Sequence, residues 1–256
     1  MNKKLHSIIF IAVMAFVACK NDSKTAAASE APTIVHKSIQ KRQVDAEGKT
    51  TRMLDYLISY PSVEKGSEGL KLAVKSFSED FVASLMRIEG DRLPLDAVMP
   101  YYLIAFRKAY AATPSIMGWS VEVKDTVLYS KPKIVSIILN GYTNFGGAHP
   151  SITSTIGNFN AATGEVINMD ELIKDRAALS AMCEKKYRVA KAQAFNSGFN
   201  FDKETRFKLP NNMGFTPFGI LFHYNTYEVG PYAIGDADFI IDYEELEKVM
   251  DVKKFL

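Results

Sequence analysis

Apolar residues recur at every third or fourth position between residues 67 and 88, at Leu70, Val74, Phe77, Phe81, Leu85 and Ile88. This spacing places them on one face of a helix, and Ser67 has the side chain expected of an N-cap. A second helical run is predicted over residues 95–112. The pattern thus predicts two consecutive helices in this part of the chain.

Other segments are typical of strands, because they alternate or are rich in β-branched and aromatic residues. Strands are predicted over residues 52–60 (ended by Pro61), 117–129, 133–142 and 151–160. A short turn at residues 130–132 joins the second and third as a hairpin. After a turn at residues 162–164, Val166 and Ile167 are expected to resume a strand.

The C-terminal third mixes short helices with strands. Asn168 is a candidate cap for a short helix over residues 169–173, and Asp175 for a longer one that ends at Phe195. Strands are predicted over residues 219–224 and 238–243, with a closing helix over residues 243–250, whereas Gly164 and Gly214 are interpreted as turn glycines. Hairpins beside segregated helices favour an α+β fold of two sub-domains, with a mainly antiparallel sheet and helices packed on one side.

The N-terminus has the pattern of an export signal. Lys3 and Lys4 precede an apolar run, and a small residue, Ala18, precedes Cys19. The 15 residues from Leu5 to Cys19 are fewer than the ~20 needed to span a bilayer. The ending resembles the bacterial lipobox, in which the cysteine thiol is acylated, although Phe16 stands where leucine is usual. The alternative is a plain signal peptide cleaved elsewhere.

This interpretation divides the chain into four parts: a lipoprotein signal peptide (1–18), a flexible tether (19–38), an N-terminal α+β segment (39–130) and a C-terminal domain (131–256). Loss of the signal removes two of the 31 basic residues and leaves them equal to the 29 acidic ones. A neutral chain has no general attraction for nucleic acid. Cys183 then remains without a disulfide partner, and a buried thiol that acts as a small hydrophobe is expected.

Two loops have the most unusual composition. In residues 141–150, adjacent glycines and a following proline place His149 at the tip of a constrained connection. Residues 224–235 carry three tyrosines and Glu228 on a loop punctuated by glycine and proline. Tyrosine offers an apolar ring with a polar tip, which suits recognition. The structural alternatives are that His149 pins its own loop and that the tyrosines seal a sheet edge.

Four motifs occur in order over residues 131–250: Gly146-Gly147-Ala148-His149, then 158–164, then 170–173, and finally 222–235 followed by 241–246. Together they resemble the RsiV/PdaC-like extracytoplasmic family, a domain of unknown function found in stand-alone lipoproteins. Pro150 departs from the family pattern, in which a small residue is commoner. The resemblance implies an α+β domain outside the cytoplasmic membrane, here without the catalytic domain of the deacetylases.

We therefore expect a non-catalytic lipoprotein of the bacterial cell envelope, anchored through Cys19 on the periplasmic face or outer surface. It would bind a cell-wall glycan or a wall-acting protein such as lysozyme, without cofactor or metal. The binding residues are expected to be Gly146, Gly147, His149, Tyr227, Glu228 and Tyr232. The alternatives are a peptidoglycan-acting hydrolase or deacetylase-related enzyme, with His149 and an acid as its pair, and a structural lipoprotein without ligand.

Overall fold

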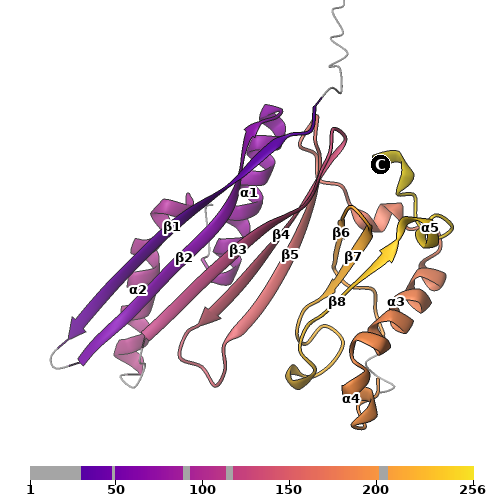
Figure 1. The fold of residues 1–256 in the computed structure, drawn as a ribbon. Coiled ribbons are helices and arrows are strands. Elements are labelled where there is room, and N and C mark those ends of the chain that lie inside the picture. Colours follow the sequence, from indigo (N-terminus) through magenta and orange to yellow (C-terminus); the bar gives the residue numbers. More distant parts are fainter. Residues whose placement is uncertain (1–29, 48–49, 89–92, 114–117, 202–206) are drawn as a thin grey trace, which may run out of the picture.

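A computed structural model describes residues 30–47, 50–88, 93–113, 118–201 and 207–256. The predicted signal peptide, Cys19 and most of the predicted tether lie outside these ranges. The described chain forms a five-stranded sheet, a three-stranded sheet and helices on each (Figure 1).

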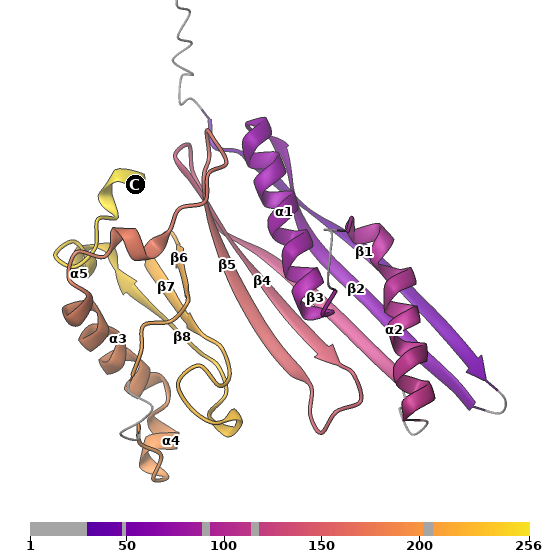
Figure 2. The ribbon, with the colours of Figure 1, turned by 180° about the vertical axis from the view of Figure 1, so that it is seen from behind.

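The larger sheet consists of β1 (Thr33–Glu47), β2 (Thr50–Lys65), β3 (Gly118–Ser130), β4 (Ile134–Asn144) and β5 (Ser151–Asn160), side by side in chain order. Its pairs are antiparallel except β2 with β3, which are parallel. A parallel pair needs a crossover connection. Here the crossover carries α1 (Glu68–Leu85), η1 (Leu95–Ala97) and α2 (Val98–Ala112), and both α-helices cover the same face of the sheet (Figure 2).

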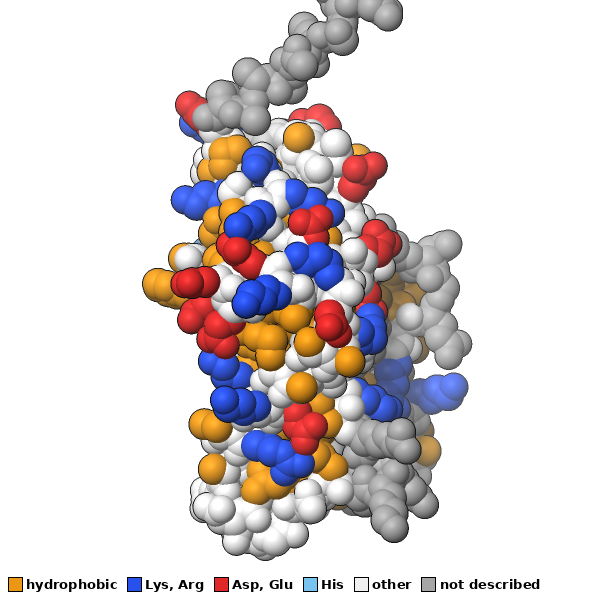
Figure 3. All heavy atoms as spheres, turned by 90° about the vertical axis from the view of Figure 1, so that its right-hand side faces the viewer, with side chains coloured by type: hydrophobic (Ala, Val, Ile, Leu, Met, Phe, Trp, Pro, Cys, Tyr) orange, Lys and Arg blue, Asp and Glu red, His pale blue; other side chains and the backbone are white. Residues whose placement is uncertain are grey.

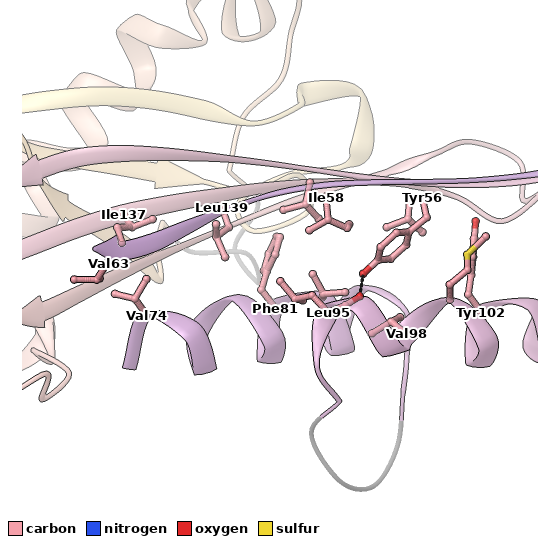
Figure 4. Close-up of a cluster of buried hydrophobic side chains, with 14 of the residues drawn as sticks. Tyr56, Ile58, Val63, Val74, Phe81, Leu95, Val98, Tyr102, Ile137 and Leu139 are labelled. Carbon is pink, nitrogen blue, oxygen red and sulfur yellow. Dashed lines mark hydrogen bonds between the residues drawn. The ribbon is translucent and has the colours of Figure 1, made fainter. Parts of the chain in front are cut away.

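The first core lies between these helices and the sheet. The side chain of Ser67 caps α1 by accepting a hydrogen bond from the Leu70 N–H at 3.1 Å. Side chains of α1 and α2 then point toward those of β2 and β4 (Figure 4), among them Val74, Phe81, Val98, Ile137 and Leu139, all buried. Glycine at position 141 lets α1 approach β4, because a Cβ there would lie 2.5 Å from Leu85.

The smaller sheet consists of β6 (Asn212–Phe215), β7 (Gly219–Tyr224) and β8 (Ala237–Asp242), all antiparallel. Its apolar face forms a second core with α3 (Arg176–Ala190), in which Leu179 and Cys183 are fully buried. Burial raises the pKa of the Cys183 thiol to about 12, in agreement with the expected small hydrophobe. The remaining short elements are η2 (Met169–Leu172), α4 (Ala192–Asn196), η3 (Tyr232–Ile234), α5 (Tyr243–Leu246) and η4 (Lys253–Phe255).

Asparagine side chains join the two sheets along the outer edge of β5. The Asn212 side-chain oxygen accepts from the Ile156 N–H at 2.9 Å, and that of Asn225 accepts from the Ser154 N–H at 2.6 Å. The Asn158 amide donates to the Met213 carbonyl at 2.7 Å. These amides take the place of a neighbouring strand and satisfy an edge that would otherwise be open.

The face formed by α3 and the C-terminal residues carries basic and acidic side chains intermixed (Figure 3). Several are paired, as in Arg188 with Glu184 at 2.7 Å and Lys253 with Glu247 at 2.7 Å. This face therefore has no broad patch of one charge.

The structure confirms the α+β class, the helix capped by Ser67, and a strand over residues 151–160. Other expectations were wrong, among them the closing helix, which ends at Leu246, and the longer helix before it, which ends at Ala190. β1 begins at Thr33, so residues 33–38 are strand, not tether, and His36 bonds Asp125 at 2.6 Å. β2 continues through Pro61, where it pairs with β1 only. Val166 forms only an isolated bridge, with Phe159, and Gly214 lies in β6.

The predicted boundary between residues 130 and 131 falls in the β3–β4 hairpin. Strands from both predicted segments therefore belong to one sheet, and the first core includes residues from both. The second core is built mainly from residues after 160.

Candidate functional site: a groove beside the Gly-Gly-Ala-His loop

Residues 145–150 connect β4 to β5 at the end of the sheet opposite the β3–β4 hairpin. Gly146 has a φ of 76°, a conformation that favours glycine. Its N–H donates to the Asn144 side-chain oxygen at 3.0 Å. Asn144, and not His149, therefore holds the glycine turn, and residues 146–149 are exposed.

Glu228 organises the second loop instead of facing solvent with its carboxylate free. One carboxylate oxygen accepts from the Asn211 N–H at 2.7 Å and the other from the Asn225 N–H at 2.8 Å. Glu228 is therefore a positioning residue of this loop. Its neighbour Tyr227 has a φ of 70° and is 63% exposed.

The two loops meet through aromatic rings. The rings of His149 and Tyr232 stack with centroids 4.0 Å apart and planes at 23°, and Tyr227 lies 5.7 Å from Tyr232. We call these three side chains the aromatic row. The structure thus brings together His149, Tyr227 and Tyr232 as the sequence predicted, with Gly146 and Gly147 on the same loop as the histidine, and turns Glu228 toward other partners.

His149 is oriented by its own loop. Its Nδ1 lies 3.1 Å from the Pro150 carbonyl oxygen, which can only accept, so Nδ1 carries the proton. In the neutral ring, Nε2 is then left as an acceptor. Within the described ranges, no three or more histidine, cysteine, aspartate or glutamate side chains gather closely enough to hold a metal ion.

A groove of about 380 Å³ runs from His149 to the C-terminal end of α1. We call it the loop groove; its lining includes Arg87, Phe145, His149, Ser151 and Thr153. Hydroxyl groups, an imidazole and a guanidinium thus surround a concave surface, the combination of shape and few polar groups common in ligand sites. Neither Arg87 nor Phe145 was among the residues predicted for this site.

Two residues at the site have a strained backbone. In the described part of the chain, Arg87 (φ 53°) and Tyr227 (φ 70°) are the non-glycine residues with positive φ. Arg87 lines the loop groove with His149, and Tyr227 belongs to the aromatic row. Conformational strain of this kind collects at functional sites, and here both instances lie around one histidine.

Among the helices of the described residues, none combines the length and apolar character needed to cross a membrane. The described residues form an α+β fold with two sheets. Two exposed loops, residues 145–150 and 224–235, carry the aromatic row, which lies beside the loop groove.

Residues 169–244 match a family described as Protein of unknown function (DUF3298). This segment includes Tyr227, Glu228 and Tyr232 but not His149. No curated protein matches the chain.

Solved structures of the same family resemble the whole fold. A DUF3298 family member from Bacteroides fragilis superposes with a TM-score of 0.67 at 18% identity, over 87% of this chain and 96% of that one. One from Pseudomonas aeruginosa gives a TM-score of 0.62 at 15% identity, over 87% and 97%. At these identities the likeness shows a shared fold.

Proposed function

We propose that this chain is a non-catalytic binding protein of the bacterial cell envelope, anchored through Cys19, and that the aromatic row binds a cell-wall glycan. The observation that carries the proposal is the stack of His149 on Tyr232, with Tyr227 beside it, at an exposed edge. A pyranose ring has an apolar C–H face and a polar rim. Aromatic rings with polar tips match both.

The loop groove supports the same ligand class. Ser151 and Thr153 contribute hydroxyl groups and His149 contributes Nε2, which can exchange hydrogen bonds with sugar hydroxyls. The resemblance to the RsiV/PdaC-like family also supports an envelope protein. The Nδ1 of His149 binds a backbone carbonyl, not a carboxylate that would orient it for acid–base chemistry, which favours ligand contact over hydrolysis.

The test is a sedimentation assay with insoluble peptidoglycan. We expect the purified protein to sediment with it, and the Tyr227→Ala/Tyr232→Ala double variant to remain in solution with an unchanged melting temperature. Phe218→Ala is the matched control, because Phe218 is 73% exposed elsewhere, at the β6–β7 turn. If the wild-type protein did not sediment with peptidoglycan, the proposal that it binds a cell-wall glycan would be wrong.

Two further outcomes identify the alternatives. If the wild-type protein retained lysozyme but not glycan, its ligand would be a wall-acting protein. Release of soluble sugar fragments over hours, abolished by His149→Ala, would make the chain a hydrolase.

A further inference from the structure

Arg87 occupies a backbone position that ordinarily favours glycine. It directly follows Met86, the C-cap of α1, and has a φ of 53°. Its N–H donates to the Ser84 carbonyl at 3.2 Å, and the Ile88 N–H donates to the Ala83 carbonyl at 3.0 Å. This pair of bonds is the Schellman motif, in which the left-handed residue is usually glycine. An arginine here destabilises the helix end relative to glycine.

The local fold gives no reason for the arginine side chain. A cation near a helix C-terminus interacts well with the helix dipole, but a residue in the last turn with ordinary helical angles would serve equally. The Arg87 side chain is exposed, and its guanidinium has no hydrogen bond or ion pair with any residue in the described part of the chain. Its charge is therefore available to a ligand.

The position of Arg87 joins two hollows. Besides the loop groove, Arg87 lines a pocket of about 460 Å³ with Tyr101, Trp119 and Phe145. The rings of Trp119 and Phe145 are 4.8 Å apart, and Phe145 also lines both hollows. Arg87 thus lies between a mainly polar groove and a mainly apolar pocket that contains several aromatic rings.

We propose that Arg87 recognises a carboxylate on the bound glycan, so that the preferred ligand is an acidic sugar rather than a neutral one. This inference rests on the proposed glycan binding. A guanidinium binds a carboxylate through two parallel hydrogen bonds, a geometry that an ammonium group cannot reproduce. The aromatic pocket beside it accommodates the apolar part of the carboxylate-bearing substituent.

The experiment compares two soluble probes by isothermal titration calorimetry. One is a tetramer of N-acetylglucosamine, which is neutral, and the other is a tetramer in which N-acetylglucosamine alternates with N-acetylmuramic acid, which carries carboxylates. We expect the wild-type protein to bind the acidic tetramer at least about tenfold more tightly, with a preference that decreases as salt is added.

The decisive variant is Arg87→Gly. We expect it to lose the preference for the acidic tetramer, to keep the affinity for the neutral one, and to melt at a higher temperature than the wild type. Arg87→Lys should keep only part of the preference. Lys185→Ala is the control for loss of one exposed charge, since Lys185 lies on α3, and it should keep the full preference.

The outcomes separate this inference from the function on which it rests. Equal binding of both tetramers by the wild type, or a preference that persists in Arg87→Gly, would overturn the role of Arg87 and leave glycan binding in place. If Arg87→Gly lost binding to both tetramers, the proposed role of Arg87 would also be wrong, because the effect would not depend on the carboxylate. Binding of neither tetramer by the wild type would overturn the proposed function itself.

Discussion

Gly69, in the first turn of α1, lies in direct backbone contact with Gly164, in the turn that follows β5. A Cβ on Gly69 would lie 1.9 Å from the Thr163 carbonyl oxygen, and one on Gly164 would lie 2.2 Å from the Gly69 carbonyl carbon. The Ser67 hydroxyl also donates to the Ala161 carbonyl at 3.3 Å. The start of α1 is thus fixed to the end of β5, more than 90 residues later in the sequence.

Gly69→Ala is expected to destabilise the protein by more than about 2 kcal/mol, because the backbone must shift to admit the methyl group. Without this contact, alanine in a helix would stabilise by about 0.5–1 kcal/mol. Chemical denaturation measures the difference. Gly198→Ala is the control: its φ is 98° with nothing within 4 Å, so it should cost only about 1–2 kcal/mol from the backbone. A stabilised Gly69→Ala would contradict the contact.

Two buried tyrosines on the helix side of the larger sheet should respond oppositely to loss of their hydroxyl groups. The Tyr56 hydroxyl donates to the Leu95 carbonyl at 2.9 Å (Figure 4), whereas the buried Tyr102 hydroxyl has no hydrogen-bond partner among the residues that the structure describes. Tyr56→Phe should cost about 1 kcal/mol, and Tyr102→Phe should be neutral or stabilising by up to about 1 kcal/mol. Thermal denaturation measures the change in stability of each variant. Equal destabilisation by Tyr56→Phe and Tyr102→Phe would show that the two hydroxyl groups do not differ in hydrogen bonding.

Asn158 should be among the most sensitive polar residues in the sheet interface. It is 3% exposed; its oxygen accepts from the Ser136 hydroxyl at 2.5 Å and its amide donates to Met213. Asn158→Ala removes the acceptor of the buried Ser136 hydroxyl, which still accepts from the Phe215 N–H, and the side-chain donor to the Met213 carbonyl, at a cost of about 2–4 kcal/mol in unfolding free energy. The exposed Asn200→Ala should change that quantity by less than about 0.5 kcal/mol. Similar values for the two variants would show that the interface tolerates loss of this amide.

His223 should make the stability depend on pH. Burial alone lowers the pKa of His223, but the hydrogen bond and charge of Asp238, with smaller contributions from Asn225 and Asp236, raise it overall above its usual 6.5. The raised pKa contributes stability that is fully present below the unfolded-state pKa and is lost as pH rises through the folded-state pKa. Unfolding free energies measured from pH 5.5 to 9 should therefore decrease through this window.

The matching variant is Asp238→Asn. It should lower the unfolding free energy by about 1 kcal/mol at pH 5.5, since Asp238 is more than half exposed and partly screened, and by less at pH 9. Asp242→Asn, on the same strand, should leave the pH profile unchanged. An unaltered profile in Asp238→Asn would mean that another group titrates.

The elements that could be predicted from sequence are those whose pattern is local. Ser67 and the apolar spacing after it define α1, and alternation defines β5. β1 was not predicted, because its residues mix polar and apolar side chains on an edge strand, where one neighbour suffices. β6 was missed because four residues with an internal glycine carry no periodic pattern.

The candidate site was predictable in part for the same reason. Glycine, proline and tyrosine mark His149, Tyr227 and Tyr232 as loop residues, but their stacking joins positions 83 residues apart. Glu228 looked available because one of its two backbone donors, Asn211, lies outside the loop. Arg87 has no sequence signal, since the unusual feature is its backbone angle.

The Ser130 hydroxyl donates to the Pro32 carbonyl at 3.0 Å. Pro32, just before the start of β1, therefore lies beside the β3–β4 hairpin. The stacked rings of His149 and Tyr232 lie at the other end of β4, roughly 35 Å away for its 11 residues. If the proposed anchor at Cys19 holds the protein from the Pro32 end, the His149–Tyr232 stack faces away from the membrane. The stack could then contact a glycan polymer that lies beyond the lipid headgroups.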